Sequence, residues 1–231
     1  MVEQVERRSS FTRAQQDYLK ALYQLHGDQR PVPTRELAQR LGISSPSVSE
    51  MVTRLSSQGL VEHDRYRGQL LTREGRKVAL ELVRHHRLLE MFLVEILGYS
   101  WDEVHEEAER LEHVISERME QRIFELLGRP QIDPHGHAIP TLQGKVRALS
   151  ARPLSESRAG ERVVVQGVSD EDAGKLRELD RRGLVPGTAV EILEVTDFEG
   201  PIEIRVNGRR SQVPLGLARA VFVEVRKDGG R

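Results

Sequence analysis

Residues 33–55 read PTRELAQRLGISSPSVSEMVTRL. Two groups of apolar residues recur there at helical spacing, Leu37, Ala38 and Leu41 before Gly42, and Val48, Met51, Val52 and Leu55 after it. A glycine between two such groups is typical of a tight turn, because glycine tolerates the backbone angles that end a helix. The stretch therefore predicts a helix-turn-helix, with Thr34 as the cap of its first helix and Ser45 as the cap of its second.

The second of these helices and the segment after it carry the residues that we expect to meet DNA. A recognition helix places its N-terminal residues at base edges in the major groove, and short hydroxyls at a helix N-terminus suit phosphates. Residues 59–72 then predict two short strands around a polar turn, which is a wing with arginines at its tip. The predicted DNA-binding residues are Thr34, Ser44, Ser45, Pro46, Ser47, Ser49, Glu50, Arg54, Arg65 and Arg67.

The composition limits the classes of protein that fit. The chain has 231 residues, a net charge of -1 and 31% charged residues, which indicates a soluble protein of one large or two to three small domains. It has no cysteine, so disulfides, thiolate metal sites and cysteine nucleophiles are excluded. We see no apolar run near the ~18 residues of a membrane span and no signal-peptide pattern, so we expect a cytoplasmic protein without a membrane partner.

The acidic residues gather in the middle of the chain. Residues 1–90 are rich in Arg and Lys, whereas residues 101–125 are rich in Asp and Glu, which suggests one region for polyanions and another for cations. We expect a helix over 102–127, antiparallel to a helix over 75–97 because the connection between them is short. His105, Glu109, Glu112 and His113 then share one helix face. These are metal-ligand types, and the alternative is a solvated charged face.

Two further groups of residues bear on this acidic face. His86 and Glu90 lie one turn apart on the 75–97 helix and are expected to face His105. Residues 11–26 predict a first helix, in which Thr12 and Gln15 have the spacing of a capping box and Asp17 lies at mid-helix.

The C-terminal third has a different pattern. Residues 128–144 form a Pro/Gly-rich break in which we interpret His135 and His137 as loop residues, and residues 145–158 read as a linker. Short β-rich stretches follow at 162–168, 189–195, 202–206, 209–214 and 220–225, with a short helix over 170–182. Asn207-Gly208 is a strong hairpin signal. Five short strands with small turns predict an SH3-like barrel.

This order of elements, with HRLLE at 86–90 and VHEEAERLEHV at 104–114, resembles the diphtheria toxin repressor family of metal-dependent transcription regulators in its long, three-domain form. The resemblance implies a mainly α fold with a small β domain. A winged helix-turn-helix would span residues 1–74, a helical metal-binding and dimerisation domain 75–144, a linker 145–158, and an SH3-like (FeoA-like) domain 159–231. It also implies a homodimer that binds palindromic double-stranded operator DNA.

The resemblance implies two metal sites. The first would use Asp17, Glu109, Glu112 and His113. The second would use His86, Glu90 and His105, completed by a residue of the barrel, for which Asp172 is favoured and Asp170 and Glu171 are rivals.

Two positions favour Mn²⁺ over Fe²⁺. Iron-type members of the family carry Met and Cys where this chain has Asp17 and Glu109, and hard oxygen ligands favour Mn²⁺ in relative terms. Zn²⁺, Co²⁺ or Cd²⁺ are expected to bind in vitro. Manganese-type members often carry a second carboxylate one turn after the Asp, where this chain has Lys20, so we expect two mononuclear sites rather than a binuclear one.

The sequence therefore predicts a metal-activated repressor, and the resemblance implies that it acts on metal-uptake genes. One alternative is a metalloenzyme that uses the His/Glu clusters for hydrolysis, but no further general acid or base accompanies them, and we predict no catalytic residues. The other alternative is a metal-independent winged-helix regulator that senses a small organic ligand.

Overall fold

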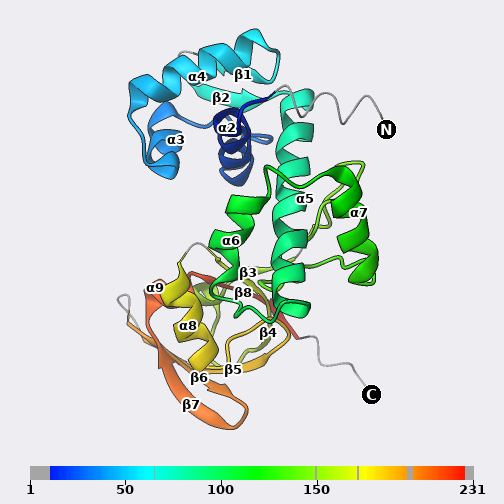
Figure 1. Ribbon diagram of the computed structural model, residues 1–231. Coiled ribbons are helices and arrows are strands. Elements are labelled where there is room, and N and C mark those ends of the chain that lie inside the picture. The colour runs from blue at the N-terminus through cyan, green and yellow to red at the C-terminus, as the bar shows by residue number, and fades with distance from the viewer. Residues whose placement is uncertain (1–10, 65, 149, 171, 197–199, 227–231) are drawn as a thin grey trace. The chain divides into compact units, whose positions relative to one another are not determined.

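The structure is a computed structural model that describes residues 11–226 except 65, 149, 171 and 197–199 (Figure 1). The chain divides into two compact units. Unit one contains Met1–His86, Glu112–Arg122 and Pro140–Lys145, and unit two contains Arg87–Leu111, Ile123–Ile139 and Val146–Arg231. Because the chain passes between the units several times, each unit brings together residues that are far apart in the sequence.

Unit one begins with a winged helix-turn-helix (Figure 1). Its elements are α2 (Arg13–Gln24), α3 (Thr34–Leu41), α4 (Ser45–Ser57), β1 (Val61–Asp64) and β2 (Gly68–Leu71). The two strands pair antiparallel, from Val61 opposite Leu71 to Asp64 opposite Gly68. The core of this part includes, from the two predicted helix faces, Leu37, Ala38, Val48, Val52 and Leu55. The predicted helix-turn-helix and wing are confirmed.

The first helix, α2, packs its apolar face into that same core. Thr12 and Gln15 form the predicted capping box, which satisfies backbone N–H groups that the first turn leaves without partners. Leu19 and Leu22 are fully buried. Asp17 lies beside this apolar face, as predicted, so the core fixes the position of its carboxylate.

The caps of α3 and α4 lie one residue earlier than predicted. Pro33 is the N-cap of α3, and Ser44 is the N-cap of α4, where its Oγ accepts a hydrogen bond from Ser47 N–H at 3.3 Å. The assignments of Thr34 and Ser45 as caps are therefore wrong. Pro33 and Ser44 already have the extended backbone of an N-cap, so the following residue is the first of each helix.

The single helix predicted over 102–127 is also wrong. Helix α5 spans Arg73–Glu95, α6 spans Val104–Leu111 and α7 spans Glu117–Leu126. Between α6 and α7, residues 112–116 form a turn, and Ser116 starts α7 because its hydroxyl accepts from Met119 N–H at 3.2 Å. Glu112 and His113 therefore lie on this turn rather than on one helix face with His105 and Glu109.

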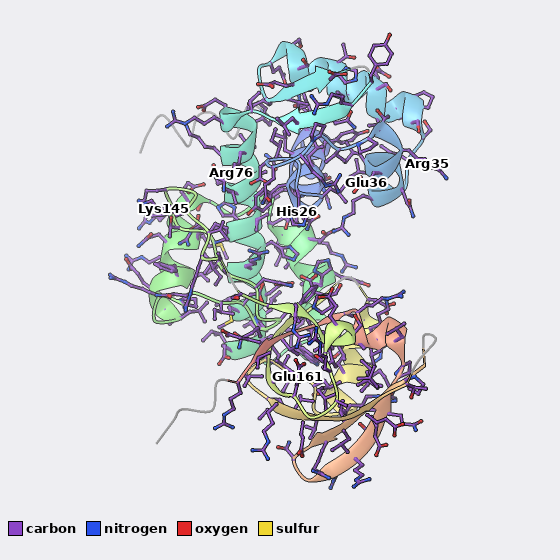
Figure 2. All side chains as sticks on the ribbon, turned by 180° about the vertical axis from the view of Figure 1, so that it is seen from behind. His26, Arg35, Glu36, Arg76, Lys145 and Glu161 are labelled. Atoms are coloured by element: carbon purple, nitrogen blue, oxygen red, sulfur yellow. The ribbon has the colours of Figure 1, made fainter. Side chains whose placement is uncertain are left out.

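A short segment, Pro140–Lys145, returns to unit one and is held by two arginines of α5. Arg84 Nη1 donates to the carbonyl oxygen of Pro140 at 2.7 Å. Arg76 Nη1 donates to the carbonyl oxygen of Gly144 at 3.3 Å (Arg76 and Lys145 are labelled in Figure 2), while its Nε pairs with Asp28 at 3.0 Å. These contacts tie the N-terminal half of α5 to a segment about 60 residues later in the chain.

Unit two contains an antiparallel six-stranded sheet in the order β3-β8-β4-β5-β6-β7. Its strands are β3 (Arg152–Pro153), β4 (Arg162–Val168), β5 (Ala189–Val195), β6 (Ile202–Val206), β7 (Arg209–Val213) and β8 (Val221–Val225). Helices α8 (Ala173–Arg181) and α9 (Leu215–Ala218) share its core (Figure 1). The five predicted strands and the SH3-like fold are confirmed, whereas β3 and the short helix η1 (Leu154–Glu156) lie in the expected linker.

The first part of the Pro/Gly-rich break, up to Ile139, belongs to unit two and is packed onto the barrel there. Gly136 has φ 92°, and a Cβ atom there would lie 2.1 Å from the carbonyl oxygen of Gln166 on β4. The N–H of Val168 donates to the carbonyl oxygen of His135 at 2.8 Å. Glycine thus permits a close backbone approach that fixes the loop, and with it His135, against the sheet. Among the described residues no helix is long and apolar enough to cross a membrane.

Candidate metal centres and nucleic-acid surface

The first candidate centre lies in unit one and joins α2 to the turn 112–116. His113 Nε2 lies 2.9 Å from Asp17 Oδ1 and 3.5 Å from Glu112 Oε1. His113 Nδ1 lies 2.7 Å from Gln16 Oε1, a contact that orients the imidazole. One ligand atom from each of Asp17, Glu112 and His113 lies within 4.8 Å of the others, which suits a single metal ion. The structure thus brings together three of the four residues that the sequence assigns to this site.

Glu112 is buried among cationic and imidazole groups. Its Oε2 lies 2.6 Å from His86 Nδ1, and both of its oxygens accept hydrogen bonds from Lys20 Nζ, at 2.8 and 2.7 Å. Burial by itself raises the pKa of Glu112, but the hydrogen bond and charge of His86 and the charge and hydrogen bond of Lys20 outweigh it and lower this pKa. Glu112 is therefore held as a carboxylate, the form that binds a cation.

The turn that carries Glu112 and His113 is held by a buried network on α5 and α7. His85 lies with Nδ1 3.3 Å from the carbonyl oxygen of Glu112 and with Nε2 2.8 Å from Glu120 Oε2. Arg84 Nε donates to Glu120 Oε1 at 2.6 Å. This network fixes the backbone of a candidate ligand from outside the centre. The sequence prediction did not include it, although the adjacent Arg84 and His85 on one helix turn were its visible signal.

The second candidate centre lies in unit two and gathers residues from α5, α6 and the barrel. His105 Nδ1 lies 3.3 Å from Glu90 Oε1 and 3.7 Å from Asp170 Oδ2. Glu90 is fully buried, and its Oε2 lies 3.7 Å from His135 Nδ1. Burial raises the pKa of Asp170, but His137 and then His105 and His135 outweigh burial and the neighbouring Glu90, so the pKa is lowered. The centre therefore holds carboxylates beside imidazoles.

Buried polar atoms that form no hydrogen bond gather at the second centre, which is an environment that suits a cation. Asp133 Oδ2, His135 Nδ1 and His137 Nδ1 are buried and form no hydrogen bond within the part of the chain that the structure describes, although Asp133 Oδ2 lies 3.2 Å from His137 Nδ1 and 3.4 Å from Arg87 Nε. One ligand atom each from Glu90, Asp133 and His135 lies within 4.8 Å of the others. Buried polar atoms that lack a hydrogen bond are costly, and ligation of a cation would satisfy them.

His135 is the residue that sequence reasoning missed. Its exposed fraction is 0%, and its environment is anionic. Burial lowers the pKa of His135, but the Glu90, Asp133 and Asp170 carboxylates outweigh burial and raise it to about 9. Surroundings that retain a proton this strongly also attract a metal cation. The only signal in the sequence was a histidine beside a glycine in a Pro/Gly-rich loop.

The remaining sequence-predicted ligands are Asp172, its rivals Asp170 and Glu171, and Glu109. Asp172 is exposed and caps α8, where its Oδ1 accepts from Lys175 N–H at 3.0 Å, so its carboxylate serves the helix backbone. The rival Asp170 occupies the expected position beside His105, whereas Glu171 lies outside the described residues. Glu109 is exposed on α6 in unit two, with Oε1 3.9 Å from His105 Nε2.

The predicted DNA-binding residues form an exposed surface on the winged helix-turn-helix. Ser44, Ser45, Pro46, Ser47, Ser49, Glu50, Arg54 and Arg67 are exposed, Thr34 is half-buried, and Arg65 lies outside the described residues. Asp64 Oδ1 accepts from the N–H groups of Tyr66 and Arg67, at 2.8 and 3.0 Å, which shapes the tip of the wing. On α3, Arg35 is exposed, while the neighbouring Glu36 pairs with Arg30 at 2.7 Å (Arg35 and Glu36 are labelled in Figure 2).

Three family models together match most of the chain. Residues 10–69 match the N-terminal DNA binding domain of iron dependent repressors, residues 72–141 match their metal binding and dimerisation domain, and residues 152–225 match the FeoA domain.

Whole-length relatives agree with these matches. The chain is 34% identical over 219 residues to the diphtheria toxin repressor of Corynebacterium glutamicum, covering 90% of this chain and 94% of that protein. It is 36% identical over 222 residues to the iron-dependent repressor IdeR of Mycobacterium tuberculosis, covering 90% and 95%. It is also similar to the solved structure of a manganese-dependent transcriptional repressor in complex with manganese, with a TM-score of 0.86, 40% identity, and coverage of 92% and 100%.

Proposed function

This chain belongs to the diphtheria toxin repressor family of metal-dependent, DNA-binding transcriptional repressors, and we propose that Mn²⁺ is the metal that activates it. It is a regulator and not an enzyme. We further propose that it acts in the cytoplasm as a homodimer on a palindromic operator, where it represses genes of metal uptake.

The set of donor atoms in the unit-one centre is the observation that supports the assignment of Mn²⁺. Asp17, Glu112 and His113 offer two carboxylates and one imidazole, and the chain has no cysteine. Oxygen donors suit Mn²⁺ better than softer ligands do, although raw affinity rises toward the later metals, so geometry and availability must supply the selection. Fe²⁺ is the second candidate metal. One relative is named an iron-dependent repressor, whereas one similar structure is named a manganese-dependent repressor, so the names of these proteins leave both metals open.

The unit-one centre supports a mechanism in which the metal joins two elements. Asp17 lies on α2, whose apolar face belongs to the core of the winged helix-turn-helix, and Glu112 and His113 lie on the turn 112–116. A bound divalent ion supplies the positive charge that these two carboxylates share. Asp17 and Glu112 then hold α2 and the turn in one arrangement, and a higher metal affinity of the DNA-competent arrangement makes the metal a co-repressor.

We propose that the unit-two centre is a second, separate metal site. Glu90, His105, Asp170 and His135 are its proposed ligands, and Asp133 is a further one. Asp170 replaces Asp172 in this proposal because the carboxylate of Asp172 is engaged as a helix cap. The roles of His86 in this site and of Glu109 in the first site, which the resemblance implies, stay predictions.

Exposed apolar side chains support the homodimer. On the turn 112–116 and on α7, Val114, Met119 and Leu126 are 75%, 45% and 62% exposed. Large apolar side chains that face water in this way are typical of a surface that a second copy covers.

Isothermal titration calorimetry with Mn²⁺, and with Fe²⁺ under anaerobic conditions, tests the metal assignment. We expect two ions per chain for the wild type, with Asp17→Ala losing one and Asp170→Asn losing the other. The exposed Asp180→Ala and the cap variant Asp172→Asn are matched controls that should bind two. A wild type that binds no Mn²⁺, or variants at Asp17 and Asp170 that bind as the wild type does, would contradict the proposal.

A further inference from the structure

Lys20 is a buried cation that lies against candidate metal ligands. It lies on α2 three residues after Asp17, and only 4% of it is exposed. Its Nζ donates to both oxygens of Glu112, at 2.8 and 2.7 Å, and lies 3.2 Å from His86 Nδ1. All of these residues belong to unit one.

The ammonium group acts on these residues as a cation but never as a ligand, because it has three donors and no lone pair. Glu112 is shared between it and the centre, since Oε1 also lies 3.5 Å from His113 Nε2. Burial of an ammonium group without a carboxylate partner costs free energy, and so does burial of a carboxylate without a cation. Lys20 and Glu112 therefore stabilise each other before any metal binds.

The Lys20 Nζ atom contacts more groups than it needs to neutralise the charge of Glu112. It is within 3.2 Å of an oxygen pair and an imidazole nitrogen, and His86 Nδ1 and Glu112 Oε2 are themselves 2.6 Å apart. A carboxylate and an imidazole that converge on one point form half of a metal site. Here the point on which they converge is occupied by the side chain of a lysine.

We propose that Lys20 is a tethered cation that takes the place of a second metal ion beside the Asp17–Glu112–His113 centre. It limits this centre to one ion, and it lowers the affinity for that ion, because the two positive charges repel and both use Glu112. The inference rests on the proposed function in one respect, namely that the centre binds a divalent metal. It makes Lys20 the residue that sets the number of ions and the metal concentration at which the centre fills.

Two substitutions separate these effects. Lys20→Glu removes the ammonium and adds a carboxylate one turn after Asp17, beside His86 and Glu112, so we expect three Mn²⁺ ions per chain instead of two. Lys20→Gln removes the charge and keeps a similar length, so we expect two ions, with the unit-one ion bound about tenfold more tightly. The matched control is Lys77→Glu, at an exposed lysine of α5 that pairs with Glu74.

The experiment measures Mn²⁺ per chain after equilibrium dialysis of the full-length protein, together with its electron paramagnetic resonance spectrum. A spin-coupled Mn²⁺ pair in Lys20→Glu, and isolated Mn²⁺ in the wild type and Lys77→Glu, would support the proposal. Two uncoupled ions in a folded Lys20→Glu, or a coupled pair already in the wild type, would overturn it. If Lys20→Glu fails to fold by circular dichroism, Lys20→Gln decides, and wild-type affinity in that variant would overturn the proposal. A wild type without any Mn²⁺ would instead overturn the proposed function, and this inference with it.

Discussion

At the scale of the residue, one hydrogen bond fixes which ring nitrogen of His135 faces the second centre. Its Nε2 lies 2.8 Å from the carbonyl oxygen of Trp101, which can only accept, so Nε2 carries a proton and Nδ1 is the nitrogen that faces Glu90 and is available to a metal. The imidazole also stacks on Trp101, with ring centroids 5.5 Å apart. Because the chain has a single tryptophan, its fluorescence reports on this centre.

We predict that His135→Phe removes the unit-two ion and retains the unit-one ion. Phenylalanine keeps the stacking on Trp101 but has no nitrogen to bind a metal. Mn²⁺ should quench the Trp101 fluorescence of the wild type and of the exposed control His63→Phe, and leave that of His135→Phe unchanged. Equal quenching in all three proteins would exclude His135 as a ligand.

Residues on regular elements could be predicted from the sequence, and residues placed by loop packing could not. Asp17 follows from helical spacing together with the family resemblance, and the structure places it beside His113. His135 is buried only because Gly136 allows the loop to approach β4, which no periodicity reveals. Asp172 and Asp170 are two residues apart in the sequence, and the role of Asp172 as the cap of α8 is the reason that we propose Asp170.

At the scale of the element, the boundary between α6 and α7 determines where two candidate ligands lie. The helical periodicity of residues 104–115 continues through the boundary, so the pattern predicts one helix. The start signal of α7 is Ser116 followed by Glu117, a cap with an acid in the first turn, which the apolar pattern masks. The β strands could be predicted more closely, because Gly and Pro turns interrupt their pattern at the boundaries.

We predict that Gly136→Ala destabilises unit two far more than Gly187→Ala does. Both glycines have positive φ, 92° and 88°, so both variants bear the strain of a left-handed backbone, which costs about 1–2 kcal/mol. Only at Gly136 would the added Cβ meet backbone, 2.1 Å from the carbonyl oxygen of Gln166, whereas Gly187 has nothing within 4 Å. Urea unfolding should therefore show a loss of at least about 3 kcal/mol for Gly136→Ala. Equal losses of unfolding free energy in the two variants would mean that the close approach of Gly136 to β4 does not contribute to stability.

We predict that Glu120→Gln weakens the element that carries Glu112 and His113, most strongly near neutral pH. Burial raises the pKa of Glu120, but the hydrogen bond and charge of His85 and those of Arg84 outweigh it, so the pKa is lowered. A lowered carboxyl pKa contributes stability that is present above the unfolded value of about 4.3 and is lost as the pH falls through the folded value.

The free energy of unfolding of apo Glu120→Gln should therefore be about 3 kcal/mol lower than that of the wild type at pH 7, because Arg84 loses a buried partner. The difference should shrink below about pH 4.5. Glu62→Gln, at an exposed position of β1 in unit one, is the matched control and should match the wild type throughout. If the difference in the free energy of unfolding between Glu120→Gln and the wild type were the same at pH 4 and pH 7, Glu120 would not act as an ionised partner of Arg84.

At the scale of the whole molecule, the proposed metal ligands come from elements that the sequence separates widely. The unit-one centre brings α2 together with the turn 112–116, and the unit-two centre brings α5 and α6 together with the loop at His135 and with Asp170. Long-range ligation of this kind would link folding, metal binding and DNA binding thermodynamically, as the proposed function requires. The order of domains could be predicted from sequence, whereas the membership of each centre required the structure.

The most direct test of this linkage measures DNA binding by fluorescence anisotropy. A palindromic duplex is first selected from random DNA by the Mn²⁺-loaded protein and is then labelled. The duplex is titrated with the wild type, with Asp17→Ala and with the control Asp180→Ala. At fixed salt, Mn²⁺ should tighten DNA binding of the wild type and of Asp180→Ala by at least about 100-fold, a coupling of about 3 kcal/mol. Asp17→Ala should bind the duplex weakly whether or not Mn²⁺ is present. Wild-type affinity that is unchanged by Mn²⁺, or Asp17→Ala that keeps the full response, would contradict metal-activated repression through the unit-one centre.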